Sequence, residues 1–323
     1  MSAFIAVDVG GTQLRAASYP EDGLNPIKID RISTRAANNT PLERLVGLIR
    51  SIWPEDQDVA SIGVAAPGPI NPFEGVIYTA PNIAGWENLP LASHLEKEFK
   101  TPVFLGNDAN LAALAEWSFG AGQGHNHLIY LTISTGIGGG VIVDGKLLLG
   151  AKGLAAEMGH VTLVPDGPLC GCGKRGHLEA VASGTAIARW AREQLAGGSR
   201  SEFLQDNNLT TKELATAAKK GDKLAISAFN RAGYFIGLAL ASFLHIFNPT
   251  MVVFGGGVSR SGKLILEPIR DTLQDRVISP QYLDNLTITT AELGDEVGLL
   301  GALALARSAI QKESYLSDQR RRS

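Results

Sequence analysis

The chain has 323 residues, 45% of them hydrophobic and 19% charged, a composition that fits an ordinary globular core and excludes a disordered chain. Its 29 lysines and arginines against 32 acidic residues leave a formal net charge of −3, which argues against a duplex-DNA binder and a basic membrane-surface protein. At about 150 residues per domain, this length predicts two domains.

The cysteine count and the N-terminal segment indicate where the protein works. Cys170 and Cys172 are the only cysteines, which excludes a disulfide framework and is typical of a reducing compartment. The first residues lack the basic segment, apolar stretch and cleavage site of a signal peptide. The longest apolar run, 232–247, is shorter than the about 20 residues that a membrane-spanning helix needs. We therefore expect a cytoplasmic protein without a membrane segment, whose charged tail, 312–323, is frayed.

Strand-like and helix-like patterns alternate along the N-terminal part of the chain. The strand patterns cover 4–8, 14–19, 59–66 and 102–107, and the helix patterns cover 42–53, 91–99 and 109–119. The turn Gly10-Gly11-Thr12 separates the first two strands, and residues 128–143 repeat this order of strand, glycine-rich turn and strand. Two such units about 125 residues apart indicate a duplicated architecture.

The second half continues in the same style. Its strand patterns are 251–254 and 286–290, and its helix patterns lie near 185–195, 211–247 and 263–275. Alternating strands and helices predict α/β layers. The glycine-rich segment 120–124 predicts a hinge, so we expect an N-terminal lobe over 1–119 and a larger C-terminal lobe over 120–297. A last helix, about 298–311, is expected to pack back on the first lobe, and a cleft between the lobes would suit a small ligand.

The first glycine turn has the groups that bind phosphate. Gly10 and Gly11 permit close backbone approach, and exposed N–H groups with the Thr12 hydroxyl can bind phosphate oxygens. Asp8, just before them, is placed to hold a hydrated Mg²⁺. The alternative is a tight hairpin with a structural aspartate, and this motif alone does not separate the two.

Two further glycine clusters favour a nucleotide site. Residues 134–140 hold four glycines and two hydroxyls, whereas a hairpin needs about two to five loop residues. Residues 255–257 are all glycine and follow an apolar strand, at the end where open α/β sheets bind ligands. None of the three clusters is a P-loop: residues 257–263 nearly fit G-x-x-x-x-G-K, but Leu264 follows where that motif needs Ser or Thr. No G-x-G-x-x-G follows the first strand, which disfavours NAD binding.

A short segment rich in turn formers contains a metal-ligand set. His160, Cys170, Cys172 and His177 supply two thiolates and two imidazoles, a closed tetrahedral set suited to structural Zn²⁺. The alternative is two buried cysteines in a mobile loop, but both cysteines of the chain and two of its six histidines fall here.

Carboxylates and amides accompany this segment. Glu157 and Glu179 flank the metal-ligand set, and Asn107-Asp108 ends an apolar strand and opens a helix. An aspartate at a helix start is most often an N-cap, yet this one also lies at the carboxyl end of a strand. Asn82 is a further polar residue, in a proline-containing turn. Such a set could bind several hydroxyls and supply one general base, so these residues alone predict an ATP-dependent phosphotransferase.

With these motifs assembled, the chain resembles the ROK family of bacterial sugar kinases and sugar-responsive repressors over nearly its whole length. The motifs that carry the resemblance are Asp8-Val-Gly-Gly-Thr12, Asn107-Asp-Ala-Asn110, Ser134-Thr-Gly-Ile-Gly-Gly-Gly140, Glu157-Met-Gly-His160, Cys170-Gly-Cys-Gly-Lys-Arg-Gly-His-Leu-Glu179, Gly255-Gly-Gly257 and Leu293-Gly-Asp-Glu-Val-Gly298. The zinc segment, 157–179, is highly specific, whereas the glycine motifs mark a wider superfamily. The resemblance implies a two-lobed actin-like and hexokinase-like ATPase fold with duplicated α/β domains around a cleft.

The resemblance also implies roles for single residues. Asp108 would be the catalytic base, and the ligands of the sugar hydroxyls would be Asn82, Asn107, Asp108, Glu157, His160 and Glu179. The contacts of ATP and Mg²⁺ would be Asp8, Gly10, Gly11, Thr12, Thr135, Gly136 and Gly256. Zn²⁺ would bind His160, Cys170, Cys172 and His177. The family commonly has a third cysteine where this chain has His177, which makes the metal site neutral where three thiolates would leave one negative charge.

By this resemblance we expect a cytoplasmic ATP-dependent hexose kinase, a glucokinase making glucose 6-phosphate. The alternatives within the enzymes are kinases for N-acetylmannosamine, N-acetylglucosamine, fructose or another hexose. Polyphosphate-using relatives lack the cysteine segment, which favours ATP as donor. Repressors of the family carry a winged helix before the first glycine turn, for which the strand at Phe4 leaves no room, and Asp108 argues against a sugar-binding pseudo-enzyme. We further expect a homo-oligomer, a dimer or tetramer, and no nucleic acid partner.

Overall fold

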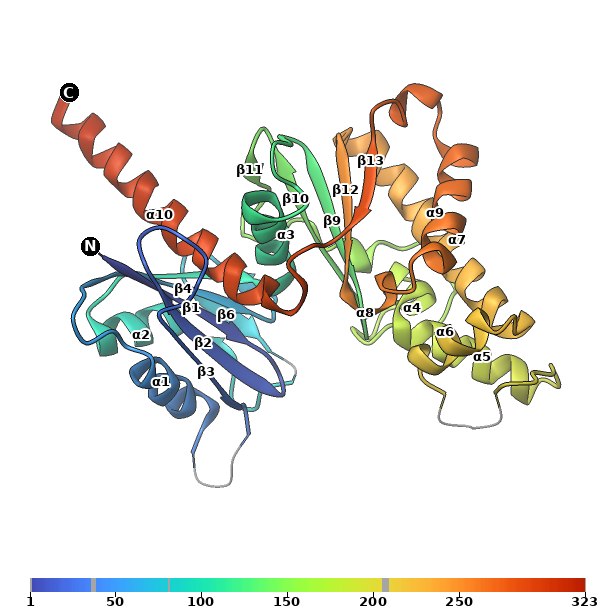
Figure 1. The fold of residues 1–323 in the computed structure, drawn as a ribbon, viewed down its shortest axis with the longest axis horizontal. Helices are drawn as coiled ribbons and strands as arrows, with labels where there is room; N and C mark the ends of the chain where they lie inside the picture. The colour runs from blue at the N-terminus through green and yellow to red at the C-terminus, as the bar shows by residue number, and fades with distance from the viewer. Residues whose placement is uncertain (1, 36–38, 81, 205–208, 323) are drawn as a thin grey trace. The chain divides into compact units, whose positions relative to one another are not determined.

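The computed structural model describes residues 2–35, 39–80, 82–204 and 209–322, with side chains through residue 309. The chain divides into two compact units (Figure 1). Unit 1 comprises Met1–Gln123, Leu147–Ala156 and Glu292–Ser323, and unit 2 comprises Gly124–Lys146 and Glu157–Ala291.

Unit 1 is built on a five-stranded sheet with the order β3-β2-β1-β4-β8. The strands are β1 (Ala3–Val9), β2 (Gln13–Tyr19), β3 (Lys28–Ser33), β4 (Val59–Ala66) and β8 (Val103–Asn107). β1 pairs antiparallel with β2 and parallel with β4, and β4 pairs parallel with β8. Asp8 therefore lies beside Ala65, and Ala66 lies beside Asn107. This register places the carboxyl ends of three parallel strands, and the predicted residues that follow them, at one edge of the sheet.

Helices cover both faces of this sheet, because side chains of a strand alternate between its two faces. Ile5 and Val7 of β1 pack in a core with α1 (Pro41–Ser51) and α2 (Leu91–Phe99), whereas Phe4 and Ala6 pack with α3 (Asp108–Phe119) and α10 (Val297–Arg322). A three-stranded sheet of β5 (Ile70–Asn71), β6 (Val76–Thr79) and β7 (Glu87–Leu89) and the short η3 (Gly294–Glu296) complete the unit.

The helix α10 reaches farther than the sequence pattern indicates. The apolar pattern ends near Ile310, but the helical backbone continues through Arg322. The added residues are mostly charged or polar and include good helix formers, so the chain can extend the helix without an apolar face. The predicted tail, 312–323, lies at this end, where no side chain is described.

Close packing of α10 on β4 makes Gly63 sensitive to substitution. A Cβ at Gly63 would lie 2.0 Å from the carbonyl oxygen of Ala302, which is backbone and cannot rotate away. We expect Gly63→Ala to lower the stability of unit 1 by at least about 2 kcal/mol through overpacking, measured as a fall in Tm or in the denaturant midpoint. Gly47→Ala is the control, since its Cβ in α1 meets open space and should stabilise the helix by up to about 1 kcal/mol. Equal shifts for the two variants would contradict the packing argument.

Unit 2 repeats the plan of unit 1 with a sheet of order β11-β10-β9-β12-β13. The strands are β9 (Leu128–Ile133), β10 (Ile137–Val143), β11 (Lys146–Leu147), β12 (Met251–Gly255) and β13 (Thr287–Thr290). β9 pairs antiparallel with β10 and parallel with β12, as β1 does with β2 and β4. The two sheets confirm the predicted duplicated α/β architecture.

The second glycine turn is shorter than the sequence indicates. Strand β10 begins at Ile137, so three of the four glycines belong to the strand and the turn itself is 134–136. A Cβ at Gly139 would lie 2.2 Å from Cε of Met158. Part of the glycine richness therefore serves the packing of the segment around Met158 on the strand and not the binding of phosphate.

The remaining elements of unit 2 are mainly helical. They are η1 (Met158–His160), α4 (Leu178–Ala182), α5 (Gly184–Ala196), α6 (Thr211–Lys219), α7 (Lys223–Phe247), α8 (Gly256–Ser259), α9 (Lys263–Arg276) and η2 (Pro280–Tyr282). The single helix pattern of 211–247 is thus two helices, because Gly221 has a φ of +89° and Asp222 caps α7 by accepting from the N–H of Ala225. By length and composition α7 is one candidate membrane span within the described residues, but 61% of its apolar window is buried inside the fold, as in a core helix.

Candidate functional site

In unit 1, Asp8 lies near the end of β1, partly shielded from solvent. Its carboxylate is 3.8 Å from Nη1 of Arg15, whose Nη2 lies 2.6 Å from Oε1 of Glu296. Burial raises the pKa of the Asp8 carboxyl above its usual range, and the Arg15 guanidinium opposes this rise. A Cβ at Gly298 would lie 2.6 Å from Cγ of Asp8, so only glycine lets the start of α10 approach this carboxylate. The carboxylate is therefore enclosed between Arg15 and the start of α10, where a bound cation would stabilise its charge.

The glycine turn that follows is braced by its neighbours. Gly10 donates its N–H to the carbonyl of Gln13 (2.8 Å), and the Thr34 hydroxyl donates to the carbonyl of Gly10 (2.6 Å). The side chain of Thr12 is exposed. The turn is thus fixed in shape while a hydroxyl stays accessible, as a phosphate contact requires.

Asn82 packs directly on this turn. A Cβ at Gly11 would lie 2.7 Å from Cβ of Asn82, so glycine is needed for the two segments to meet. A cavity of about 460 Å³ opens here, lined by Gly11, Thr12, Ser33, Arg35 and Asn82. The structure therefore joins a predicted sugar ligand to a predicted phosphate turn. Pro81, the proline of the predicted rigid turn, lies outside the described residues.

Asn107 and Asp108 occupy the junction of β8 and α3. Asn107 is the N-cap of α3, and its Oδ1 accepts from the N–H groups of Ala109 (3.0 Å) and Asn110 (3.2 Å). Asp108 is the first helical residue, is exposed, and accepts from Ala109 N–H at 2.8 Å. The capping role therefore falls mainly on Asn107, which keeps its amide N–H₂ as a donor, while Asp108 is an exposed residue that a hydroxyl could reach.

In unit 2, the predicted nucleotide residues come together at the carboxyl ends of two parallel strands. The turn 134–136 follows β9 and closes through a bond from Ser134 N–H to the carbonyl of Gly136 (2.9 Å), with Ser134 and Thr135 exposed. Gly256 follows β12 with a φ of +82°, and a Cβ there would lie 2.3 Å from the carbonyl oxygen of Ile133. The sheet register thus joins two glycine segments that are more than 100 residues apart.

The start of α5 also contacts the turn, although no residue of α5 is among the predicted site residues. Gly184 donates its N–H to the carbonyl of Ser134, and the Thr185 hydroxyl donates to the carbonyl of Thr135, both at 2.8 Å. A signal was available, because Ser183 before two small residues is a favourable N-cap. Nothing in the sequence, however, indicates which turn this helix start meets.

The four predicted metal ligands lie together, with one ligand atom from each within 4.8 Å of every other. Sγ of Cys170 is 3.8 Å from Nδ1 of His160, and Sγ of Cys172 is 3.3 Å from Nδ1 of His177. Tetrahedral Zn²⁺, with Zn–S of about 2.3 Å and Zn–N of about 2.0 Å, places neighbouring S and N atoms about 3.5 Å apart. The ligand set and its spacing fit a four-coordinate zinc ion.

Glu179 connects this cluster to the glycine turn. Its Oε2 accepts from the N–H of Ile137 (3.0 Å), and its Oε1 lies 3.3 Å from Sγ of Cys170. A Cβ at Gly136 would lie 2.4 Å from Oε2, so the carboxylate lies directly on the turn. Burial raises the pKa of the Cys170 thiol to about 12, so a metal ion would have to displace its proton on binding.

Glu157 and His160 are carried by η1. Glu157 precedes it and is exposed, and its carbonyl accepts from the N–H of His160 (3.0 Å). A Cβ at Gly159 would lie 1.9 Å from the carbonyl oxygen of Ile137, so η1 packs against the start of β10. The metal cluster, Glu157 and the turn 134–136 therefore form one neighbourhood in unit 2.

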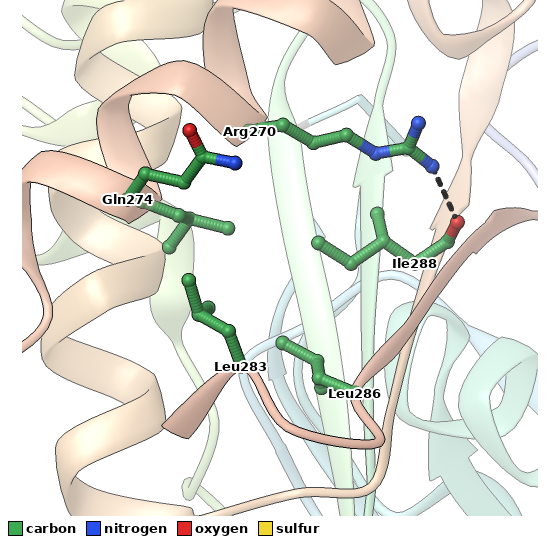
Figure 2. A pocket seen from close by; sticks show the side chains of 6 residues that line it. Arg270, Gln274, Leu283, Leu286 and Ile288 are labelled. Atoms are coloured by element: carbon green, nitrogen blue, oxygen red, sulfur yellow. Dashed lines mark hydrogen bonds between the residues drawn. The ribbon is translucent and has the colours of Figure 1, made fainter. Parts of the chain in front are cut away.

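Another cavity, of about 260 Å³, lies in unit 2 and contains none of the predicted site residues. It lies between α9 and the segment leading into β13, lined by Arg270, Leu273, Gln274, Leu283, Leu286 and Ile288 (Figure 2). Figure 2 shows the Arg270 side chain extended along the cavity to the carbonyl of Ile288, a bond of 3.0 Å. The lining offers leucines, an isoleucine, a glutamine and the Arg270 guanidinium, but no carboxylate or histidine that could act as a base.

Comparison with known proteins agrees with these features. The sequence model of the ROK family matches residues 4–309. The chain is 37% identical over 319 residues to the glucokinase of Thermotoga maritima, covering 95% of this chain and 98% of that protein. A solved ROK family glucokinase from Streptomyces griseus, in complex with glucose and AMPPNP, is 35% identical with a TM-score of 0.78, covering 95% of this chain and all of the other. A ROK family transcriptional regulator, a homologue of the E. coli MLC protein, is 27% identical with a TM-score of 0.85, covering 95% of this chain and 78% of the other. These likenesses confirm the predicted hexokinase-like α/β fold, and the chain belongs to the ROK family.

Proposed function

We propose that this protein is a glucokinase, which transfers the γ-phosphoryl group of ATP to the 6-hydroxyl of glucose. The observation that carries the proposal is the position of Glu179, whose carboxylate accepts from the N–H of Ile137, directly after the turn 134–136, and lies 3.3 Å from Sγ of Cys170 of the metal cluster. One side chain thereby couples a segment suited to phosphates with a segment suited to hydroxyls. A kinase needs both at one place, because phosphoryl transfer depends on positioning and charge neutralisation.

Asp108 is the base that takes the proton from the attacking hydroxyl. Its exposed carboxylate, in the first turn of α3, supports this role. The other sugar ligands in this proposal are Asn82, Asn107, Glu157, His160 and Glu179. Carboxylates and an imidazole accept and donate bonds to several hydroxyls at once, which orients the reacting one.

The ATP phosphates lie on the two glycine turns, and the residues assigned to them are Gly10, Gly11, Thr12, Thr135 and Gly136, with Gly256 near the nucleoside. Asp8 would hold the hydrated Mg²⁺, whose charge would neutralise the phosphates. The partly buried carboxylate of Asp8, enclosed by the start of α10, fits this role.

The metal cluster is structural in this proposal. His160, Cys170, Cys172 and His177 would hold the zinc ion, which would orient the ring of His160, and the other nitrogen of this ring would bind a sugar hydroxyl. In this proposal the protein also works in the cytoplasm as a homo-oligomer, and its substrates are a hexose and ATP.

The test is ADP release from Mg-ATP with a panel of glucose, mannose, fructose, N-acetylglucosamine and N-acetylmannosamine. We expect the highest kcat/KM with glucose. A higher kcat/KM with an N-acetylated sugar would change the assigned substrate but not the assignment as a kinase.

The likeness to a ROK family transcriptional regulator makes a sugar-responsive regulator the second candidate. This second function is favoured if folded, zinc-loaded protein binds glucose but releases no ADP with any sugar.

A further inference from the structure

Arg35 lies just after β3, in a place that neither the sequence motifs nor the proposed site includes. Its guanidinium lines the cavity beside the first glycine turn, together with Gly11, Thr12 and Asn82. Its Nη2 donates to the backbone carbonyl of Asn82 at 3.3 Å. The side chain therefore reaches across the cavity from the β3 side to the segment that carries Asn82.

The charge of Arg35 has no counterpart in the described lining of the cavity, whose other members are neutral. A guanidinium has five N–H donors in a fixed fork, and the bond to Asn82 uses one nitrogen. Two other cations lie near this turn: Arg15 is committed to Glu296 and to the carbonyl of Asp295, and Arg44 donates through Nε to the carbonyl of Ser33 and does not line the cavity. Arg35 is thus the cation best placed to receive an anion in this cavity.

The neighbours of Arg35 indicate which anion fits. The turn at Gly11 and Thr12 suits phosphate oxygens, and Asn82 suits a sugar hydroxyl. A group that touches both at once is a phosphoryl group joined to a sugar. We propose that Arg35 binds the phosphoryl group of glucose 6-phosphate, and the same group while it is being transferred; this inference rests on the proposed glucokinase function.

The test is calorimetric titration of glucose and of glucose 6-phosphate into the wild type, Arg35→Gln and Arg35→Lys. For Arg35→Gln we expect glucose 6-phosphate affinity to fall about 10- to 100-fold, the loss of a charge-assisted bond, with glucose affinity within about twofold. Arg35→Lys should be intermediate, since it keeps the charge and loses the fork. Lys28→Gln removes one positive charge from the other end of β3 and should change neither affinity.

Three results would overturn the inference. Unchanged glucose 6-phosphate affinity in Arg35→Gln, or no binding of that ligand by the wild type, would show that Arg35 does not contact the phosphoryl group. Equal losses for glucose and glucose 6-phosphate would show that Arg35 only holds the Asn82 segment in place. Wild-type ADP release with glucose reports separately on the proposed function, so an active wild type with an unchanged Arg35→Gln removes this inference alone.

Discussion

Replacing Asp108 with asparagine is expected to lower kcat at least about 100-fold while leaving glucose affinity within a few-fold, because a positioned base contributes about 10²- to 10⁴-fold to the rate. Asparagine keeps the size of the side chain and an oxygen that can accept from the N–H of Ala109, but it cannot take a proton. Since Asn107 supplies the cap of α3, the helix should stay intact. The loss should therefore fall on kcat and not on binding.

The measurement is steady-state kinetics with glucose and Mg-ATP, together with calorimetric titration of glucose. Asp56→Asn is a matched control, because it makes the same change at an exposed position in the loop before β4. Near-normal turnover in Asp108→Asn would remove Asp108 as the base. A loss of turnover accompanied by an equal loss of glucose affinity would instead make it a sugar ligand only.

Replacing Cys172 with serine is expected to release the metal and weaken glucose binding about 10-fold or more. The wild type should contain about one zinc ion per chain, and the variant close to none, because the closed site loses one of its four ligands. Without the metal, the ring of His160 is no longer held in one orientation, and its bond to the sugar hydroxyl weakens. Elemental analysis gives the first quantity and calorimetric titration of glucose the second.

Two further variants sharpen this test. Lys174→Ser changes a residue of the same loop whose carbonyl, and not its side chain, contacts the N–H of Cys170, so both quantities should stay at the wild-type level. His177→Cys should keep the metal, since a thiolate is also a good zinc ligand. A wild type without zinc would remove the metal proposal, and a zinc-free Cys172→Ser with unchanged glucose affinity would separate the metal from the sugar site.

Much of the fold could be predicted from periodicity and turn chemistry. The strands β1, β4, β8, β9 and β12 lie close to their predicted ranges, because buried parallel strands are short apolar runs bounded by turn residues. Strand β3 was missed, since most of its residues are exposed and polar. The break between α6 and α7 was also missed, although a signal was available: the polar run 219–223 interrupts the apolar pattern, and Gly221 precedes Asp222, a favourable N-cap.

The chemical groups of this protein can be listed from its sequence alone: a short segment with four metal ligands, an aspartate at a strand-to-helix junction, and two glycine turns after apolar strands. Which of these groups meet depends on the fold. Glu179 touches the turn at Gly136, and Arg35 lines the cavity beside Gly11, although no spacing along the chain indicates either contact. A motif is local, because neighbouring residues set it. These contacts instead join segments that are brought together by sheet register and by close packing at glycines, and both depend on the whole core.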